Sequence, residues 1–154
     1  MNSQSSIRII GGKWRSRKVH FMGKEMLRPT PDRVRETLFN WLTPFIVESV
    51  CLDLFAGSGV LGFESLSRGA ASVVALENDR DCYQQIAKNK DVLQADKMEL
   101  LNKNVIDWLQ QSKFTADIVF VDPPYNKGML AKTLQLLEDH KWVQAQSLIY
   151  FEQL

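Results

Sequence analysis

The chain has 154 residues, a hydrophobic content of 45% and a formal net charge of +1. This length suits one domain with a substantial core, and no apolar run approaches the ~20 residues that a membrane-spanning helix needs. Cys51 and Cys82 lack metal-type spacing, and no apolar signal core follows Met1. These features exclude a membrane protein and a disulfide scaffold, and we expect a reduced, cytoplasmic protein that needs no metal.

Charge is distributed unevenly along the chain. Residues 1–35 contain nine basic and two acidic residues, which gives +7, so the remaining residues carry −6. Residues 8–19 are predicted to form a β-hairpin or an extended arm, with Gly11 and Gly12 at the turn. A basic arm with interleaved aromatic residues, Trp14 and Phe21, favours contact with nucleic acid, although a solvated surface loop can have the same composition.

The stretch that follows the arm is a strong helix start. Thr30 is predicted as the N-cap, Pro31 as the first helical residue, and Asp32 as an acid at the positive end of the helix dipole. Pro44 is predicted to end this helix. The residues expected on its inner face are Val34, Leu38, Trp41 and Leu42.

Strands and helices alternate from Val50 to the end of the sequence. The expected strands cover residues 50–54, 72–76, 98–101, 116–121 and 148–151. One expected helix follows Gly62 and runs through about Ser67, and the others cover residues 79–90, 107–111 and 129–139. Such alternation predicts an α/β fold with a doubly wound, mostly parallel sheet and right-handed crossovers.

A glycine-rich loop, Gly57-x-Gly59-x-x-Gly62, follows the first of these strands. The pattern alone is weak, but Asp53 precedes it and Glu77 closes the next strand, where an acid can bind ribose hydroxyls. A nicotinamide cofactor carries a pyrophosphate that Asp53 would repel. S-adenosylmethionine carries an ammonium and a sulfonium but no phosphate, which suits a nearby carboxylate. Asp53 as a turn cap and Glu77 as a surface strand end are the purely structural interpretations.

The segment Asp122-Pro123-Pro124-Tyr125 ends another buried strand with a stiff turn at the carboxyl edge of the sheet. The Asp122 carboxylate and the Pro123 carbonyl can accept hydrogen bonds from an exocyclic amine, while Tyr125 can stack on its base. These residues can therefore orient an amine toward a methyl donor. The structural alternative is a rigid turn that merely ends the strand.

These motifs resemble the class I S-adenosylmethionine-dependent methyltransferases that modify exocyclic amines. More closely, the chain resembles the bacterial RsmD family of 16S rRNA guanine-N2 methyltransferases. The segments that carry this resemblance are residues 8–15, 27–42, 53–59, 66–70 and 120–125.

The resemblance implies a Rossmann-like sheet with strand order 3-2-1-4-5. It also implies a basic N-terminal arm in residues 1–27 and a methyltransferase domain in residues 28–154. The family's sheet normally continues with a further antiparallel strand pair, whereas this sequence ends at Leu154. We therefore expect a shortened sheet with an exposed fifth strand, and a monomer unless that edge pairs with another chain.

The resemblance further implies S-adenosylmethionine as the cofactor and 16S rRNA or an assembling small ribosomal subunit as the partner. The implied catalytic residues are Asp122, Pro123, Pro124 and Tyr125. The implied cofactor-binding residues are Asp53, Phe55, Ala56, Gly57, Ser58, Gly59, Glu77, Asn78, Asn104, Val105 and Asp122. The implied RNA-binding residues are Arg8, Lys13, Trp14, Arg15, Arg17, Lys18, Arg28, Thr30, Arg33 and Arg35. A DNA adenine or cytosine amino-methyltransferase, and an RNA-binding module without turnover, are the alternatives.

Overall fold

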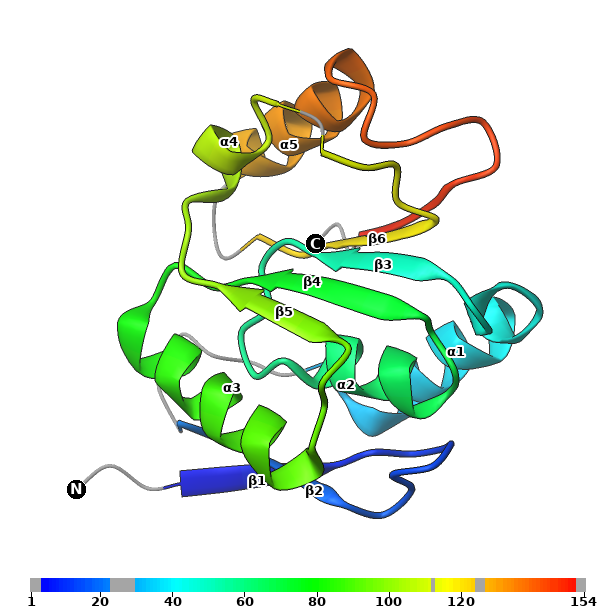
Figure 1. Ribbon diagram of the computed structural model, residues 1–154, viewed down its shortest axis with the longest axis vertical. Coiled ribbons are helices and arrows are strands. Elements are labelled where there is room, and N and C mark those ends of the chain that lie inside the picture. Colours follow the sequence, from blue (N-terminus) through cyan, green and yellow to red (C-terminus); the bar gives the residue numbers. More distant parts are fainter. Residues whose placement is uncertain (1–3, 23–29, 112, 124–126, 152–154) are drawn as a thin grey trace.

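The computed structural model describes residues 4–22, 30–111, 113–123 and 127–151 (Figure 1). In chain order its elements are β1 (Gln4–Arg8), β2 (Lys18–Met22), α1 (Asp32–Ile46), β3 (Val50–Asp53), α2 (Val60–Ser67), β4 (Ser72–Leu76), α3 (Arg80–Leu93), β5 (Met98–Leu101), α4 (Val105–Trp108), β6 (Ile118–Val121), α5 (Lys127–Asp139) and β7 (Leu148–Phe151). Among the described residues, no helix is long and apolar enough to cross a membrane.

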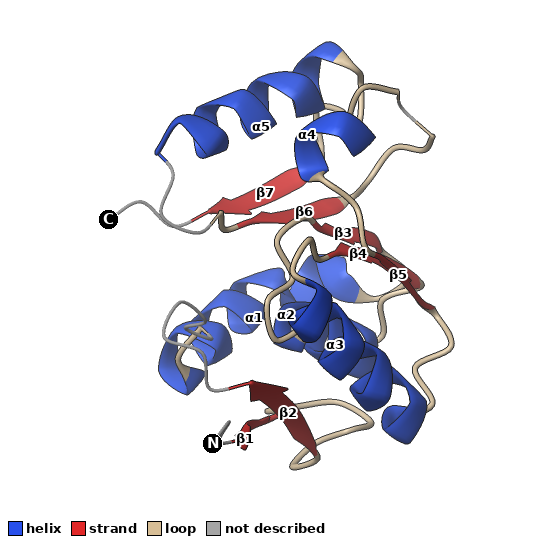
Figure 2. Ribbon diagram, turned by 90° about the vertical axis from the view of Figure 1, so that its left-hand side faces the viewer, coloured by secondary structure: helices blue, strands red, loops and turns tan. Residues whose placement is uncertain are grey.

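The central sheet has five parallel strands in the order β5-β4-β3-β6-β7. Counted within this sheet, the order is 3-2-1-4-5, so the predicted α/β fold and strand order are confirmed. Helices α1, α2 and α3 cover one face and α4 and α5 cover the other (Figures 1 and 2). Within the described part of the chain, β7 pairs with β6 alone.

A separate hydrophobic cluster lies on each face of the sheet, because the side chains of each buried strand alternate between the two faces. Phe120 points to the α1–α3 side, where its ring centroid lies 6.1 Å from that of Phe39. Trp142 lies in the opposite cluster, stacked on Trp108 with centroids 4.6 Å apart. Its indole Nε1–H donates to the Leu109 carbonyl at 2.9 Å, which satisfies the polar atom of this buried side chain.

The N-terminal strands form an antiparallel hairpin on the outer side of the helices, as a fourth layer beyond α2 and α3 (Figure 2). The predicted hairpin is therefore confirmed: its strands extend to Gln4 and Met22, and Gly11 and Gly12 lie in the connecting residues 9–17, where the Gly12 carbonyl accepts from the Arg15 amide at 3.2 Å. Gly12 has a second role. Its φ is +81°, and an added Cβ would lie 1.9 Å from the Ser67 carbonyl oxygen, so only glycine permits this close approach to α2.

Helix α1 differs from its predicted boundaries at both ends. The N-cap is Pro31 rather than Thr30, and no side chain caps this end. The helix also continues through Pro44 to Ile46. Proline removes one backbone hydrogen bond, but Ile46 is buried and anchors the last turn against the core, which outweighs that loss.

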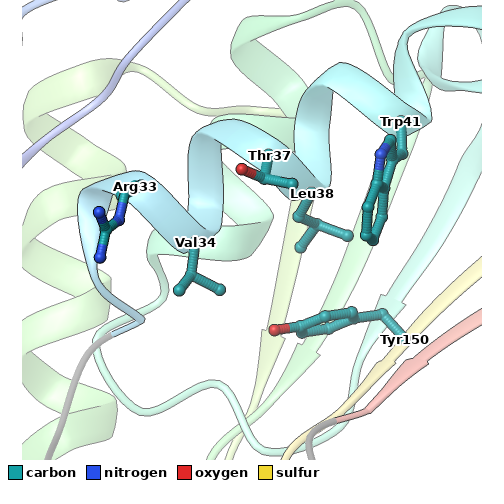
Figure 3. A pocket seen from close by; sticks show the side chains of 6 residues that line it. All are labelled: Arg33, Val34, Thr37, Leu38, Trp41 and Tyr150. Carbon is teal, nitrogen blue, oxygen red and sulfur yellow. The ribbon is translucent and has the colours of Figure 1, made fainter.

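The buried face of α1 is also rotated relative to the prediction. Leu38 and Leu42 are buried as expected, whereas Val34 and Trp41 are 39% and 71% exposed. A groove of about 290 Å³ between α1 and β7 explains the difference, because both side chains line it together with Tyr150 (Figure 3). The positions that α1 instead turns into the protein include Arg35 and Phe39.

Candidate active site

Three carboxylates follow the ends of adjacent strands at the carboxyl edge of the sheet. Asp53 is the last residue of β3 and pairs in register with Ala75 of β4 and Phe120 of β6. Glu77 and Asp122 each lie two residues beyond those partners. The parallel register therefore brings all three acids to one edge, where ligands of open α/β sheets bind.

Asp53 is a buried acid with an unsatisfied oxygen. Its side chain is 2% exposed, and its Oδ2 atom has no hydrogen-bond partner among the described residues. Burial, together with the neighbouring charges of Glu77 and Asp122, raises the pKa of this carboxyl to about 7. Such a group disfavours its own ionisation until a cation arrives, which makes it a ligand-binding candidate.

The glycine loop turns directly from β3 into α2. Gly57 and Gly59 have φ values of +60° and +81°, which glycine adopts without strain. The Gly59 amide donates to the Ala56 carbonyl at 2.8 Å, and the buried Ser58 hydroxyl accepts from the Val60 amide at 3.2 Å. At Gly62 an added Cβ would lie 2.9 Å from the Met98 side chain, so the third glycine lets α2 approach the sheet closely.

Glu77 ties this loop to the end of β4. One carboxylate oxygen accepts from the Gly57 amide and the other from the Asp79 amide, both at 2.8 Å. Burial is the main cause that raises the pKa of the Glu77 carboxyl. Asn102 was missed by the sequence analysis: its amide donates to the carbonyls of Glu77 at 2.8 Å and Asn78 at 3.1 Å. Its position directly after β5, at the same edge of the sheet, was the available signal.

The remaining predicted cofactor residues lie around the same edge. Asn104 caps α4, accepting from the Asp107 amide at 3.1 Å, and Val105 is buried beneath it. The helix of this region covers Val105–Trp108 rather than the predicted 107–111, because the Asn104 cap starts it earlier. Phe55 is half-buried, and Ala56 is buried with its amide bonded to the Leu76 carbonyl at 2.9 Å.

The predicted catalytic turn is described in part. Asp122 and Pro123 are half-buried directly after β6, whereas Pro124 and Tyr125 lie outside the described residues. Within the ranges that the structure covers, no group of three His, Cys, Asp or Glu side chains is arranged to hold a metal ion.

The predicted RNA-binding residues divide into exposed and buried groups. The exposed ones are Arg8, Lys13, Arg15, Arg17, Lys18 and Arg33. Arg28 lies outside the described residues. Arg35 was predicted wrongly, because its side chain is fully buried and bonded within the protein. Trp14 and Thr30 are 7% and 8% exposed and are part of the packed interior, so neither presents its side chain to RNA.

Comparisons with known proteins show the family of this chain. The family model described as conserved hypothetical protein 95 matches residues 7–154. The chain is 50% identical to ribosomal RNA small subunit methyltransferase D of Escherichia coli strain K12, over 98% of this chain and 76% of that protein. It is 44% identical to the protein of the same name from Haemophilus influenzae, over 98% of this chain and 80% of that protein.

Structural similarity agrees with the sequence relationship. The solved structure of the candidate methyltransferase yhhF from Escherichia coli superimposes with a TM-score of 0.87 at 51% identity, covering 96% of this chain and 81% of that one. The chain therefore belongs to the RsmD family, the family of the ribosomal RNA small subunit methyltransferase D proteins.

Proposed function

We propose that this protein transfers a methyl group from S-adenosylmethionine to the exocyclic N2 of a guanine in 16S rRNA. The observation that carries the proposal is the convergence of Asp53, Glu77 and Asp122 at one edge of the sheet, in a chain of the RsmD family. S-adenosylmethionine, when bound, supplies an electrophilic methyl group.

The cofactor fits the charge of the site. The unpartnered oxygen of Asp53 is buried beside the glycine loop, and three acids share this edge. A phosphate-bearing cofactor would add negative charge here, whereas ammonium and sulfonium groups offset it. Asp53 and residues 55–59 would hold the methionine part, Glu77 and Asn78 the ribose, and Asn104 and Val105 the adenine.

Asp122 and Pro123 would present the target amine. A guanine N2 amine is a weak nucleophile because its lone pair is delocalised into the ring. When the Asp122 carboxylate and the Pro123 carbonyl accept its two N–H groups, the lone pair is directed at the methyl carbon, and the positive charge that develops on nitrogen is stabilised. Pro124 would stiffen this turn, and Tyr125 would stack on the base.

The exposed cations of the hairpin and the start of α1 would bind the RNA backbone. Phosphate contacts by Lys and Arg fix the position of an RNA without reading its sequence. A paired guanine cannot reach a pocket at the sheet edge, so the target is expected in a loop or flipped out of a helix. Naked 16S rRNA or an assembling small subunit would be the partner, and a monomer in the cytoplasm is the proposed state.

The test is methyl transfer from isotopically labelled S-adenosylmethionine to unmodified small-subunit particles and to naked 16S rRNA. Mass mapping of the nuclease fragments should find one labelled guanine, with the label on N2. Duplex DNA of mixed sequence is the control substrate. Labelled adenine or cytosine in DNA would replace the proposal with a DNA amino-methyltransferase, and RNA binding without label in any substrate would contradict turnover altogether.

A further inference from the structure

Glu64 is a charged residue in the middle of α2, and its side chain is fully buried. Its Oε1 accepts from the Ile10 amide at 2.9 Å and from Arg35 Nε at 3.3 Å. Its Oε2 accepts from the Gly11 amide at 3.0 Å and from Arg68 Nε at 2.9 Å. This one carboxylate therefore joins the hairpin, α1 and the end of α2.

Arg35 extends the same network from α1. Its guanidinium is fully buried and donates through Nη2 to the Arg8 carbonyl and to Asp32 Oδ1, the latter at 3.2 Å. Nη1 lies 3.5 Å from the Thr30 carbonyl. The planar fork of arginine is needed here, because a single ammonium group cannot reach the carboxylate and both carbonyls together.

Two further side chains, one on α3 and one on α2, also hold the hairpin. Asn89 of α3 donates to the His20 carbonyl at 2.6 Å and accepts from the His20 amide at 3.3 Å. The Ser67 hydroxyl of α2 accepts from the Trp14 amide at 2.9 Å and donates to the Gly11 carbonyl at 2.6 Å. All three helices that cover this face of the sheet therefore bind the hairpin through its backbone.

Backbone attachment leaves the basic side chains of the hairpin on the outer surface. Arg8, Lys13 and Arg15 are exposed, although the backbone around them is bonded to buried groups. We define the basic face as the exposed cations of the hairpin. Its members are Arg8, Lys13, Arg15, Arg17 and Lys18.

The tip of the basic face lies far from the glycine loop. Lys13 donates its amide to the Ser67 carbonyl, and Arg17 reaches the Val92 carbonyl, so the tip contacts the C-terminal ends of α2 and α3. The N-termini of these helices follow the carboxyl edge of the sheet. The tip therefore lies at the helix ends opposite the carboxyl edge, which are separated from it by the helix lengths of about 12 Å for α2 and about 21 Å for α3.

We propose that Glu64 and Arg35 are positioning residues that hold the basic face at a fixed distance from the methyl-transfer edge. An RNA bound by the basic face then delivers its target guanine to Asp122. This inference rests on the function proposed above. A hydrophobic contact could stabilise the hairpin equally well, since buried ion pairs add little net stability compared with apolar packing of the same volume. Hydrogen bonds to the backbone are directional, so they also fix the position of the hairpin relative to the helices.

The principal test uses Arg35→Lys, which keeps a positive charge beside Glu64 but loses the fork that reaches the hairpin. The KM for RNA should rise at least tenfold. The kcat at saturating RNA and the Kd for S-adenosylmethionine should each change less than threefold. Amide hydrogens of Ile9, Ser16 and Arg17 should exchange at least tenfold faster, while that of Leu54 in the sheet should be unchanged.

Asn89→Ala provides an independent variant, because it releases the hairpin from α3 without disturbing any buried charge. It should also raise the KM for RNA and accelerate hydrogen exchange of the hairpin amides. Asn40→Ala, on the exposed side of α1, is the matched control. If Arg35→Lys fails to fold, Asn89→Ala still tests whether a fixed hairpin sets the KM for RNA.

A purely structural role would lower kcat, cofactor affinity and RNA affinity together, in proportion to the folded fraction. That result, or an unchanged KM for RNA with a released hairpin, would overturn the proposal. Hydrogen exchange and salt-dependent RNA binding need no turnover. If the wild-type protein binds RNA but methylates nothing, only the proposed function fails.

Discussion

Asp53 and Glu64, the two buried carboxylates on either side of α2, differ in how their charges are balanced. Glu64 accepts hydrogen bonds from two backbone amides and two arginines, so its charge is balanced within the protein. Asp53 has an oxygen without a partner and faces two further acids. Burial alone therefore does not distinguish the proposed ligand-binding acid from the structural one. The oxygen without a partner does, because it leaves an interaction that a ligand can complete.

The largest expected effect is a loss of stability when Glu64, the acid whose charge is balanced within the protein, is replaced. Glu64→Gln should lower the free energy of unfolding by about 3–5 kcal/mol, because it removes the buried anion that pairs with the buried Arg35 and the half-buried Arg68. Urea unfolding followed by circular dichroism measures this. Glu99→Gln on the exposed part of β5 is the control and should change stability by less than about 0.5 kcal/mol. A small loss for Glu64→Gln would mean that the network contributes little to the fold.

Removal of an edge carboxylate should instead affect chemistry. Asp122→Ala should reduce kcat about 10²–10³-fold, since one acceptor of the target amine is lost. The Kd for S-adenosylmethionine should stay within about threefold and the unfolding free energy within about 1 kcal/mol. Single-turnover methyl transfer and calorimetry separate these quantities. Unchanged turnover would remove Asp122 from the catalytic turn.

Asp53 should respond to pH in the opposite sense to an ordinary paired acid. Its pKa in the folded protein is about 7, above the ordinary value of 3.8, so its contribution to stability is lost as pH rises through 7. Asp53→Asn should therefore raise the unfolding free energy at pH 8 by about 2–3 kcal/mol in the absence of cofactor. Thermal unfolding of both proteins at pH 6 and pH 8 tests the sign of this stability difference. A destabilised variant at pH 8 would show that the Asp53 charge is already balanced.

The same titration should govern cofactor binding. The ionised carboxylate suits a cationic ligand, so S-adenosylmethionine should bind the wild-type protein about tenfold more tightly at pH 8 than at pH 6. Asp53→Asn should bind more weakly and lose this dependence on pH. Calorimetry at both pH values makes the measurement, and an equal pH dependence in the variant would assign it to another group.

The smallest expected effect concerns the loop between these acids. Gly59→Ala places a methyl group 3.0 Å from the Phe63 ring at a φ of +81°, and should cost about 1–2 kcal/mol of stability. Gly69 has a φ of +108° but its nearest neighbour would be 3.4 Å away. Gly69→Ala is thus the matched control for backbone strain without crowding. Chemical denaturation of both variants compares them, and equal losses would mean that strain alone is responsible.

Most of the fold was predictable from the sequence because each core strand is a short apolar run followed by a helical pattern. The edge acids were predictable for the same reason, since Asp53, Glu77 and Asp122 each sit at or just beyond the end of such a run. Asn102 occupies the equivalent position after β5, but an amide in a polar stretch gives a weaker signal than an isolated acid.

Arg35 and Trp14 could not be assigned correctly from local patterns. An arginine in a basic segment predicts exposure, and its partner Glu64 is 29 residues away in the chain. Periodicity also misplaced the inner face of α1, because the groove beside β7 accommodates Val34 and Trp41 while the charged Arg35 turns inward. Such exchanges depend on tertiary contacts, which outweigh the hydrophobicity of single residues.

The hydrogen bonds that hold the hairpin have a consequence for how the chain folds during its translation. Glu64 bonds to residues 53 and 54 positions earlier, and Asn89 to one 69 positions earlier. A chain made from its N-terminus therefore completes the docking surface only after α3, several seconds after the hairpin at about 5–20 residues per second. After residue 35 the nascent chain carries +7, and after α3 it still carries +3, because residues 36–93 contain eight acidic and four basic side chains. A nearly neutral protein is thus strongly cationic early in its translation.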